Sequence, residues 1–96
     1  MGLRDLLNSK RTEILRLARQ HGADNVRVFG SVVRNDEDSD SDIDLLVRME
    51  ETRSYFDLVR LLDALESLLG RKVDIITDDG LSPYLRKQIL AEAAPL

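Results

Sequence analysis

Apolar side chains recur at a helical spacing in the first quarter of the chain and again in its second half. Residues 3–21 place leucine, isoleucine and alanine every three or four positions, with basic residues between them. That spacing predicts an amphipathic helix that ends near Gly22, because glycine commonly stops a helix. A longer apolar stripe predicts a second helix, from a Ser54–Asp57 capping pair to a stop at Gly70, and we expect this stripe to lie in the core.

Short apolar runs between the helical stretches are typical of strands. The chain has three such runs, and they cover residues 25–29, 42–48 and 73–76. The second and third runs are separated by the long predicted helix, and a connection of that length usually joins parallel strands with a right-handed crossover. We therefore expect the last two strands to be parallel neighbours.

Two more helices complete the predicted order. A short helix is expected to begin at Ser31, directly after the first strand, and another begins at Ser82-Pro83 and is closed by Pro95. The prediction is an α/β (α+β) fold with a small mixed three-stranded sheet flanked by helices, in the order α-β-α-β-α-β-α. Residues 1–96 are expected to form a single domain, because a chain of this length builds only one modest core.

The composition narrows the possible functions. The chain has 96 residues, a net charge of −4 and no cysteine. An acidic balance argues against a protein that coats nucleic acid, whose surface is usually basic. Without cysteine there are no disulfides and no thiol chemistry, and no apolar run approaches transmembrane length. We expect a cytoplasmic protein with no membrane partner and no direct nucleic-acid partner.

Two aspartates stand at the start of the second predicted strand. Asp42 and Asp44 flank Ile43 and lead into an apolar run. Side chains alternate faces along a strand, so the two carboxylates project together while Ile43 points the other way. Paired carboxylates at the mouth of a buried strand repel each other and lose hydration, so each is expected to need a partner such as a cation. The alternative is a solvated acidic turn, which is the commoner explanation of an isolated Asp-x-Asp.

The end of the first predicted strand favours the cation site. Gly30-Ser31 follows this strand directly, and a helix that opens at such a point presents free N–H groups and a hydroxyl to an anion. If the first two strands are antiparallel, this anion site lies beside Asp42 and Asp44. A phosphate cradle next to divalent-cation ligands is the combination that phosphoryl or nucleotidyl transfer requires.

Two further residues are candidates for the same site. Asp74 lies inside the third apolar run, where an acid is costly unless it is compensated, and parallel pairing would place it beside Asp42 and Asp44. The alternative is an edge-strand aspartate that discourages unwanted pairing. Arg34 follows Ser31 by three positions, so its guanidinium can reach a phosphate or a carboxylate, although a lone arginine on a helix often only solubilises it.

These residues carry a family resemblance. The segments Gly30-Ser31, Arg34 and Ser41-Asp42-Ile43-Asp44-Leu45 resemble the signature of the polymerase-β-like nucleotidyltransferase superfamily, and within it the minimal nucleotidyltransferases (MNT), the antitoxin partners of HEPN-domain toxins. The resemblance covers nearly the whole chain and implies that superfamily's fold. One departure is Asn35, which stands where this branch usually has glycine, and asparagine tolerates the left-handed backbone region better than most residues.

The resemblance implies a reaction and a role for each residue. Members of the MNT branch transfer AMP from ATP to a tyrosine hydroxyl of a cognate HEPN ribonuclease toxin, with which they also form complexes. The implied cofactor is Mg²⁺, as two ions, with ATP as substrate, and a homo-oligomer or hetero-oligomer with the toxin is expected. The implied site consists of Asp42, Asp44 and Asp74 for metal binding and catalysis, and of Gly30, Ser31 and Arg34 for the triphosphate.

Two other functions remain open at this point. The chain could be a catalytically idle antitoxin that neutralises its toxin by binding alone. It could instead transfer a nucleotide to a small molecule such as an aminoglycoside, as other branches of the superfamily do. The short chain counts against the second alternative, because it leaves no room for a domain that would enclose a sugar.

Overall fold

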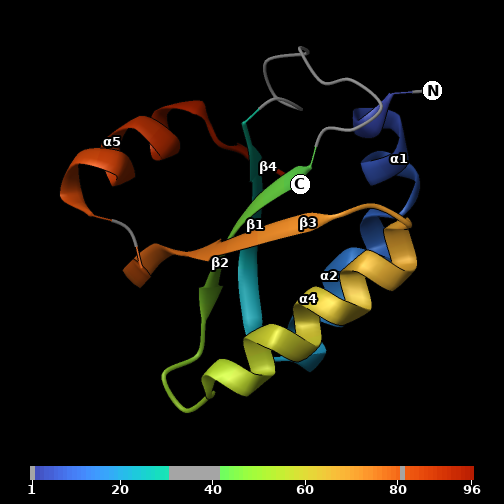
Figure 1. Cartoon of the computed structure of the whole chain (residues 1–96), viewed down its shortest axis with the longest axis horizontal. Coiled ribbons are helices and arrows are strands. Elements are labelled where there is room, and N and C mark those ends of the chain that lie inside the picture. The colour runs from blue at the N-terminus through green and yellow to red at the C-terminus, as the bar shows by residue number, and fades with distance from the viewer. Residues whose placement is uncertain (1, 31–41, 81) are drawn as a thin grey trace.

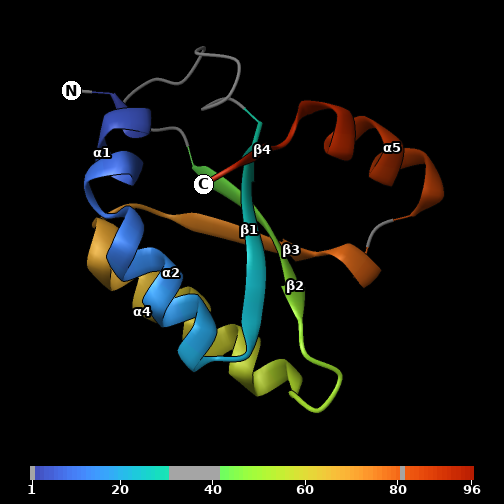
Figure 2. The ribbon, with the colours of Figure 1, turned by 180° about the vertical axis from the view of Figure 1, so that it is seen from behind.

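The computed structural model describes residues 2–30, 42–80 and 82–96. Within them a four-stranded sheet, in the order β3-β2-β1-β4, carries α1, α2 and α4 on one side and α5 on the other (Figure 1; Figure 2). The elements in chain order are α1 (Leu3–Ser9), α2 (Arg11–Gln20), β1 (Ala23–Phe29), β2 (Ile43–Met49), α4 (Tyr55–Leu69), β3 (Val73–Thr77), the 3-10 helix η1 (Asp78–Gly80), α5 (Pro83–Glu92) and β4 (Ala94–Pro95). Among the described residues, no helix combines the length and the apolarity needed to cross a bilayer.

The strand directions confirm the prediction. β1 pairs antiparallel with β2, and β2 pairs parallel with β3. The connection from β2 to β3 contains α4, whose Leu61, Leu65 and Leu69 are buried at the spacing that its apolar stripe predicted. They pack into one core with the sheet residues of that side, including Ile43 and Val73. The mixed sheet therefore has one face covered by α1, α2 and α4.

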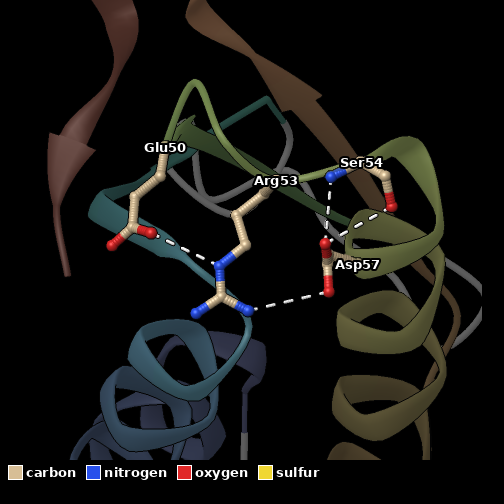
Figure 3. A network of polar contacts seen from close by, with 4 residues as sticks. All are labelled: Glu50, Arg53, Ser54 and Asp57. Carbon is tan, nitrogen blue, oxygen red and sulfur yellow. Dashed lines mark hydrogen bonds and ion pairs between the residues drawn. The ribbon is translucent and has the colours of Figure 1, made fainter.

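The start of α4 is held by a capping pair, as the sequence predicted (Figure 3). The Asp57 carboxylate accepts a hydrogen bond from the Ser54 backbone N–H at 2.9 Å and one from the Ser54 hydroxyl at 3.4 Å. Arg53 adds ion pairs to Glu50 at 3.3 Å and to Asp57 at 3.7 Å. The Ser54 N–H, more than the Arg53 charge, holds the pKa of Asp57 below its ordinary value, because it stabilises the ionised carboxylate. The helix ends at Gly70, which has a left-handed backbone.

The predicted single N-terminal helix is wrong, since the segment forms two helices that break at Lys10. The backbone of Lys10 (φ −106°, ψ 10°) leaves the helical region there. The break falls in residues 8–12, which contain no apolar side chain to hold the turn against the core. The Ser9 hydroxyl donates to the Leu6 carbonyl at 2.8 Å, a local bond of the kind that competes with helix continuation.

The predicted three strands are also one too few. Ala94 and Pro95 form β4, which pairs antiparallel with Val28 and Arg27 of β1. Proline argues against a strand in a sequence, because it lacks the N–H that a central strand donates. β4 lies at the edge of the sheet, where that N–H is not needed. The Leu96 N–H continues the pairing by donating to the Val26 carbonyl at 3.1 Å.

The first strand begins earlier than predicted because it contains a bulge. The pairing with β2 shifts between Asp24 and Arg27, so one extra residue is accommodated in β1. Asn25 lies at this shift with a φ of 50°, a left-handed conformation that asparagine adopts more easily than most residues. The bulge lets both Ala23 and Val26 face the core. The short helix predicted from Ser31 lies outside the described residues.

Candidate active site

The carboxylates of β2 and β3 meet at the face of the sheet away from α1, α2 and α4. Asp44 is the register partner of Asp74 in the parallel pairing. Their neighbours Ile43 and Val73 are register partners too, and both are buried in the core. Because side chains alternate along a strand, Asp44 and Asp74 project from the opposite, open face. Asp44 is half-buried and Asp74 is exposed.

Hydrogen bonds fix the two strand starts against each other. The Ile43 N–H donates to the Lys72 carbonyl at 3.0 Å, directly before the two paired aspartates. The Val73 N–H donates to the Glu66 carboxylate on α4 at 3.0 Å. β3 is thus tied to α4 as well as to β2. The register that opposes Asp44 to Asp74 is therefore held from both sides.

Gly30, directly after β1, lies against the Asp44 carboxylate. Phe29 is the register partner of Asp44 in the antiparallel pairing, and Gly30 follows with a φ of +79°. A side chain at Gly30 would collide with the Asp44 carboxylate, since a Cβ there would lie 3.2 Å from the Asp44 Cγ and still closer to Oδ2. Only glycine allows this backbone and this close approach together. The two predicted motifs therefore meet at Gly30 and Asp44.

Of the other predicted site residues, only Asp42 lies in the described part of the chain. Asp42 immediately precedes β2 and is half-buried. Within residues 2–30, 42–80 and 82–96, no three acidic, histidine or cysteine side chains come close enough to hold a metal ion between them. The three-carboxylate metal centre thus stays a prediction, of which the structure shows the Asp44–Asp74 pairing. Ser31 and Arg34 lie outside the described residues.

Two arginine–aspartate pairs border the open face and were not predicted. Arg27 of β1 forms an ion pair of 2.6 Å with Asp78, the first residue of η1, and both side chains are mostly buried. Arg48 of β2 binds Asp24 through two bonds of 2.7 and 2.8 Å in an exposed position. The Arg48 guanidinium lowers the pKa of the Asp24 carboxyl by hydrogen bonding to it. One sign of the first pair was present in the sequence, because Arg27 is a charged residue inside the apolar run that forms β1.

A family model that describes the nucleotidyltransferase domain matches residues 11–95, which include every element from α2 to β4. The chain belongs to this family. It is a nucleotidyltransferase, and the match confirms the superfamily resemblance that Gly30-Ser31 and the Asp-Ile-Asp segment indicated.

Relatives place the nucleotidyltransferase more narrowly. It is 40% identical over 87 residues to MJ0435 of Methanocaldococcus jannaschii, a candidate protein adenylyltransferase, and the match covers 91% of this chain and 94% of that one. It is 38% identical over 76 residues to the protein adenylyltransferase MntA of Thermococcus cleftensis, covering 79% and 77% of the two chains. A solved candidate minimal nucleotidyltransferase is 52% identical, with a TM-score of 0.89 and coverage of 100% and 97%. The MNT branch predicted from the sequence is confirmed.

More distant solved structures share the fold. One is a toxin–antitoxin complex with AMP-PNP, at 24% identity and a TM-score of 0.75, covering 88% of this chain and 69% of that one. Another is a complex of an MNT antitoxin with a tri-AMPylated HEPN toxin of Shewanella oneidensis, at 22% identity and a TM-score of 0.70, covering 92% and 69%. At these identities the likeness concerns the arrangement of helices and strands.

Proposed function

We propose that this nucleotidyltransferase transfers AMP from ATP to a tyrosine hydroxyl of a cognate HEPN-domain toxin and so acts as its antitoxin. The observation that supports this proposal is the placing of Asp44 opposite Asp74 and against Gly30, on the open face of the sheet. The names of its relatives point the same way, since MntA is a protein adenylyltransferase and one MNT antitoxin is bound to an AMPylated HEPN toxin.

The donor set suits Mg²⁺. In proteins Mg²⁺ is usually held by one or two carboxylates, with waters and substrate phosphates as the remaining ligands. Two carboxylates on the open face of the sheet suit this kind of coordination better than a site closed by protein ligands alone. Asp44 and Asp74 would hold the cation together with Asp42, which lies two positions before Asp44. When bound, Mg²⁺ neutralises the triphosphate and polarises the bond to the leaving group.

The chain's own residues would then position the reactants. Gly30 lets the backbone lie against the Asp44 carboxylate. We assign Gly30, Ser31 and Arg34 to the β- and γ-phosphates, through backbone N–H groups, the Ser31 hydroxyl and the Arg34 guanidinium. The tyrosine oxygen attacks the α-phosphorus, the bond from that phosphorus to the bridging oxygen breaks, and pyrophosphate leaves. Asp74, exposed on the open face, is the carboxylate best placed to receive the hydroxyl proton. Positioning and charge neutralisation supply most of the rate enhancement in such reactions.

The test uses the full chain, Mg²⁺, α-labelled ATP and a purified cognate HEPN-domain toxin. We expect label on a toxin tyrosine, identified by mass spectrometry, and no label with Asp44→Asn. Tight binding of the toxin without any label would support the idle antitoxin instead. Label on an aminoglycoside but not on the toxin would overturn the proposed acceptor, and full activity of Asp44→Asn would overturn the proposed site.

A further inference from the structure

Helix α5 is largely exposed, with only Ile89 and Glu92 half-buried. It follows β3 through η1, and none of its ten residues is buried. Both overall views show it on the side of the sheet opposite α1, α2 and α4 (Figure 1; Figure 2). By contrast, α4 buries three leucines in the core. Within the described part of the chain, α5 therefore receives little of the packing that holds the other long helices.

The exposed surface of α5 is apolar on several sides. Tyr84 is 73% exposed, Leu85 48% and Leu90 41%. With 3.6 residues per turn, these three positions point to three different sides of the helix. A ten-residue helix is marginal in water unless its apolar side chains pack against other protein. Its Ser82 cap, which accepts a hydrogen bond from the Leu85 N–H at 3.3 Å, stabilises only the first turn.

The described part of the chain does not enclose α5. Between this helix and the ends of β2 and β3 lies a surface cavity of about 400 Å³. Its lining is largely charged and includes Arg48, Asp78, Asp79 and Arg86. The apolar side chains of α5 are therefore available to another protein.

The charge and the position of α5 indicate which kind of protein binds it. α5 carries Arg86 and Lys87 against a single acid, Glu92, so it is locally basic in a chain whose net charge is −4. It also follows β3, the strand that carries Asp74, after the short helix η1. A protein that binds α5 is thereby held beside the open face with its carboxylates. Binding to α5 would orient a protein substrate toward these carboxylates, and a small domain has few other surfaces that could do so.

We propose that α5 is the docking helix for the protein substrate, the toxin of the proposed function on which this inference rests. The toxin would contact the side of α5 on which Lys87 lies between Tyr84 and Leu90, with apolar side chains against Tyr84 and Leu90 and a carboxylate facing Lys87. Helix-in-groove recognition of this kind relies on a few apolar anchors, and tyrosine is frequent among the residues that dominate binding. Docking and transfer then use different residues, α5 for affinity and the open face for chemistry.

The chain offers a matched pair of variants for the test. Tyr84 on α5 and Tyr55 at the start of α4 are 73% and 74% exposed, so truncating either one leaves the core intact. Affinity for the purified toxin is measured by calorimetry without ATP, so that no transfer takes place. We expect Tyr84→Ala to weaken binding about tenfold or more, Leu90→Ser and Lys87→Glu to weaken it too, and Tyr55→Ala to change it less than about twofold. In the transfer assay, Tyr84→Ala should raise KM for the toxin and leave kcat unchanged.

The outcomes separate this inference from the proposed function. Unchanged affinity in Tyr84→Ala, with normal AMP transfer to the toxin, would overturn docking by α5 and leave the function intact. Weakened binding in Tyr84→Ala, with no transfer even by the unaltered chain, would support docking and remove the enzymatic role. If sedimentation shows that the chain alone is a dimer and that Tyr84→Ala dissociates it, α5 binds a second copy and the inference is wrong. Circular dichroism of each variant checks that the fold is retained.

Discussion

Asp44 and Asp74 lie opposite each other on two parallel strands, with their neighbours Ile43 and Val73 buried on the other face. Like charges placed side by side in a sheet destabilise it, and neither strand can slip by one residue without exposing a core side chain. The fold therefore fixes two like charges side by side, where a bound cation would be stabilised. A pairing of this kind is expected at a functional site and has no evident structural benefit.

Asp74→Asn should separate stability from activity. The substitution keeps the shape of the side chain and removes one of the two charges, so we expect the free energy of unfolding without Mg²⁺ to stay constant or rise by about 0.2–1 kcal/mol. AMP transfer should fall by roughly 100-fold or more, because a ligand of the cation is lost. Urea unfolding and the labelled-ATP assay measure the two effects. Asp63→Asn, at an exposed position of α4, is the control and should change neither.

The pairing of Asp44 with Asp74 could be predicted because it depends on simple geometric rules. Alternation placed Asp42 and Asp44 on one face, and the long helical connection made β2 and β3 parallel. The meeting of Gly30 with Asp44 followed from the same topology. These rules give the direction of a strand and the face on which a side chain lies. They do not say which side chains form a hydrogen bond or an ion pair. The ion pair between Arg27 and Asp78, 51 positions apart, was therefore missed.

The missed parts of the fold share a different cause. The break at Lys10, the bulge at Asn25 and the two-residue strand at Pro95 each contradict a local preference only slightly. Ser9 and Asn25 act through local backbone geometry and Pro95 through its place at the sheet edge, and propensities of about a few tenths of a kcal/mol do not identify such positions. Predicted element types were reliable where an apolar pattern was long, as in α4, and unreliable where one or two residues set the geometry.

Gly30→Ala should impair transfer more than an equal backbone strain elsewhere. Gly30 and Gly70 both have a positive φ, +79° and +65°. A Cβ at Gly70 meets nothing within 4 Å, whereas a Cβ at Gly30 collides with the Asp44 carboxylate. Gly70→Ala should cost only the backbone strain, about 1–2 kcal/mol, without loss of activity. Gly30→Ala should cost more and lower AMP transfer at least about tenfold, since Asp44 must move.

Chemical denaturation and the transfer assay test this pair together. Equal stability losses with equal activity in the two alanine variants would show that the Asp44 carboxylate tolerates displacement. That result would contradict the assignment of Gly30 to the site.

Replacing Asn25 by glycine should leave the stability nearly unchanged, whereas replacing it by valine should lower the stability. Its φ of 50° places it in the left-handed region at the bulge of β1. Asn25→Gly should change the free energy of unfolding by less than about 0.5 kcal/mol, because glycine adopts this conformation freely. Asn25→Val should lower it by about 1–2 kcal/mol, because a β-branched side chain is strained there. Asn25 is exposed, so neither change removes core packing, and equal urea midpoints for the two variants would contradict this explanation of the bulge.

Acid should remove the contribution of Asp57 to the stability of α4. The Ser54 N–H lowers the pKa of Asp57 in the folded chain below its ordinary value of 3.8, so the ionised carboxylate favours folding. This stabilisation is fully present above the unfolded-state pKa and is lost as the pH falls through the lower, folded-state pKa. Unfolding free energies of the unaltered chain and of Asp57→Asn should therefore differ by a constant amount from pH 7 to about pH 5 and converge below about pH 4. The measurement is a series of urea titrations at fixed ionic strength, and a difference that stays constant down to about pH 2 would mean that the Asp57 charge contributes nothing to the cap.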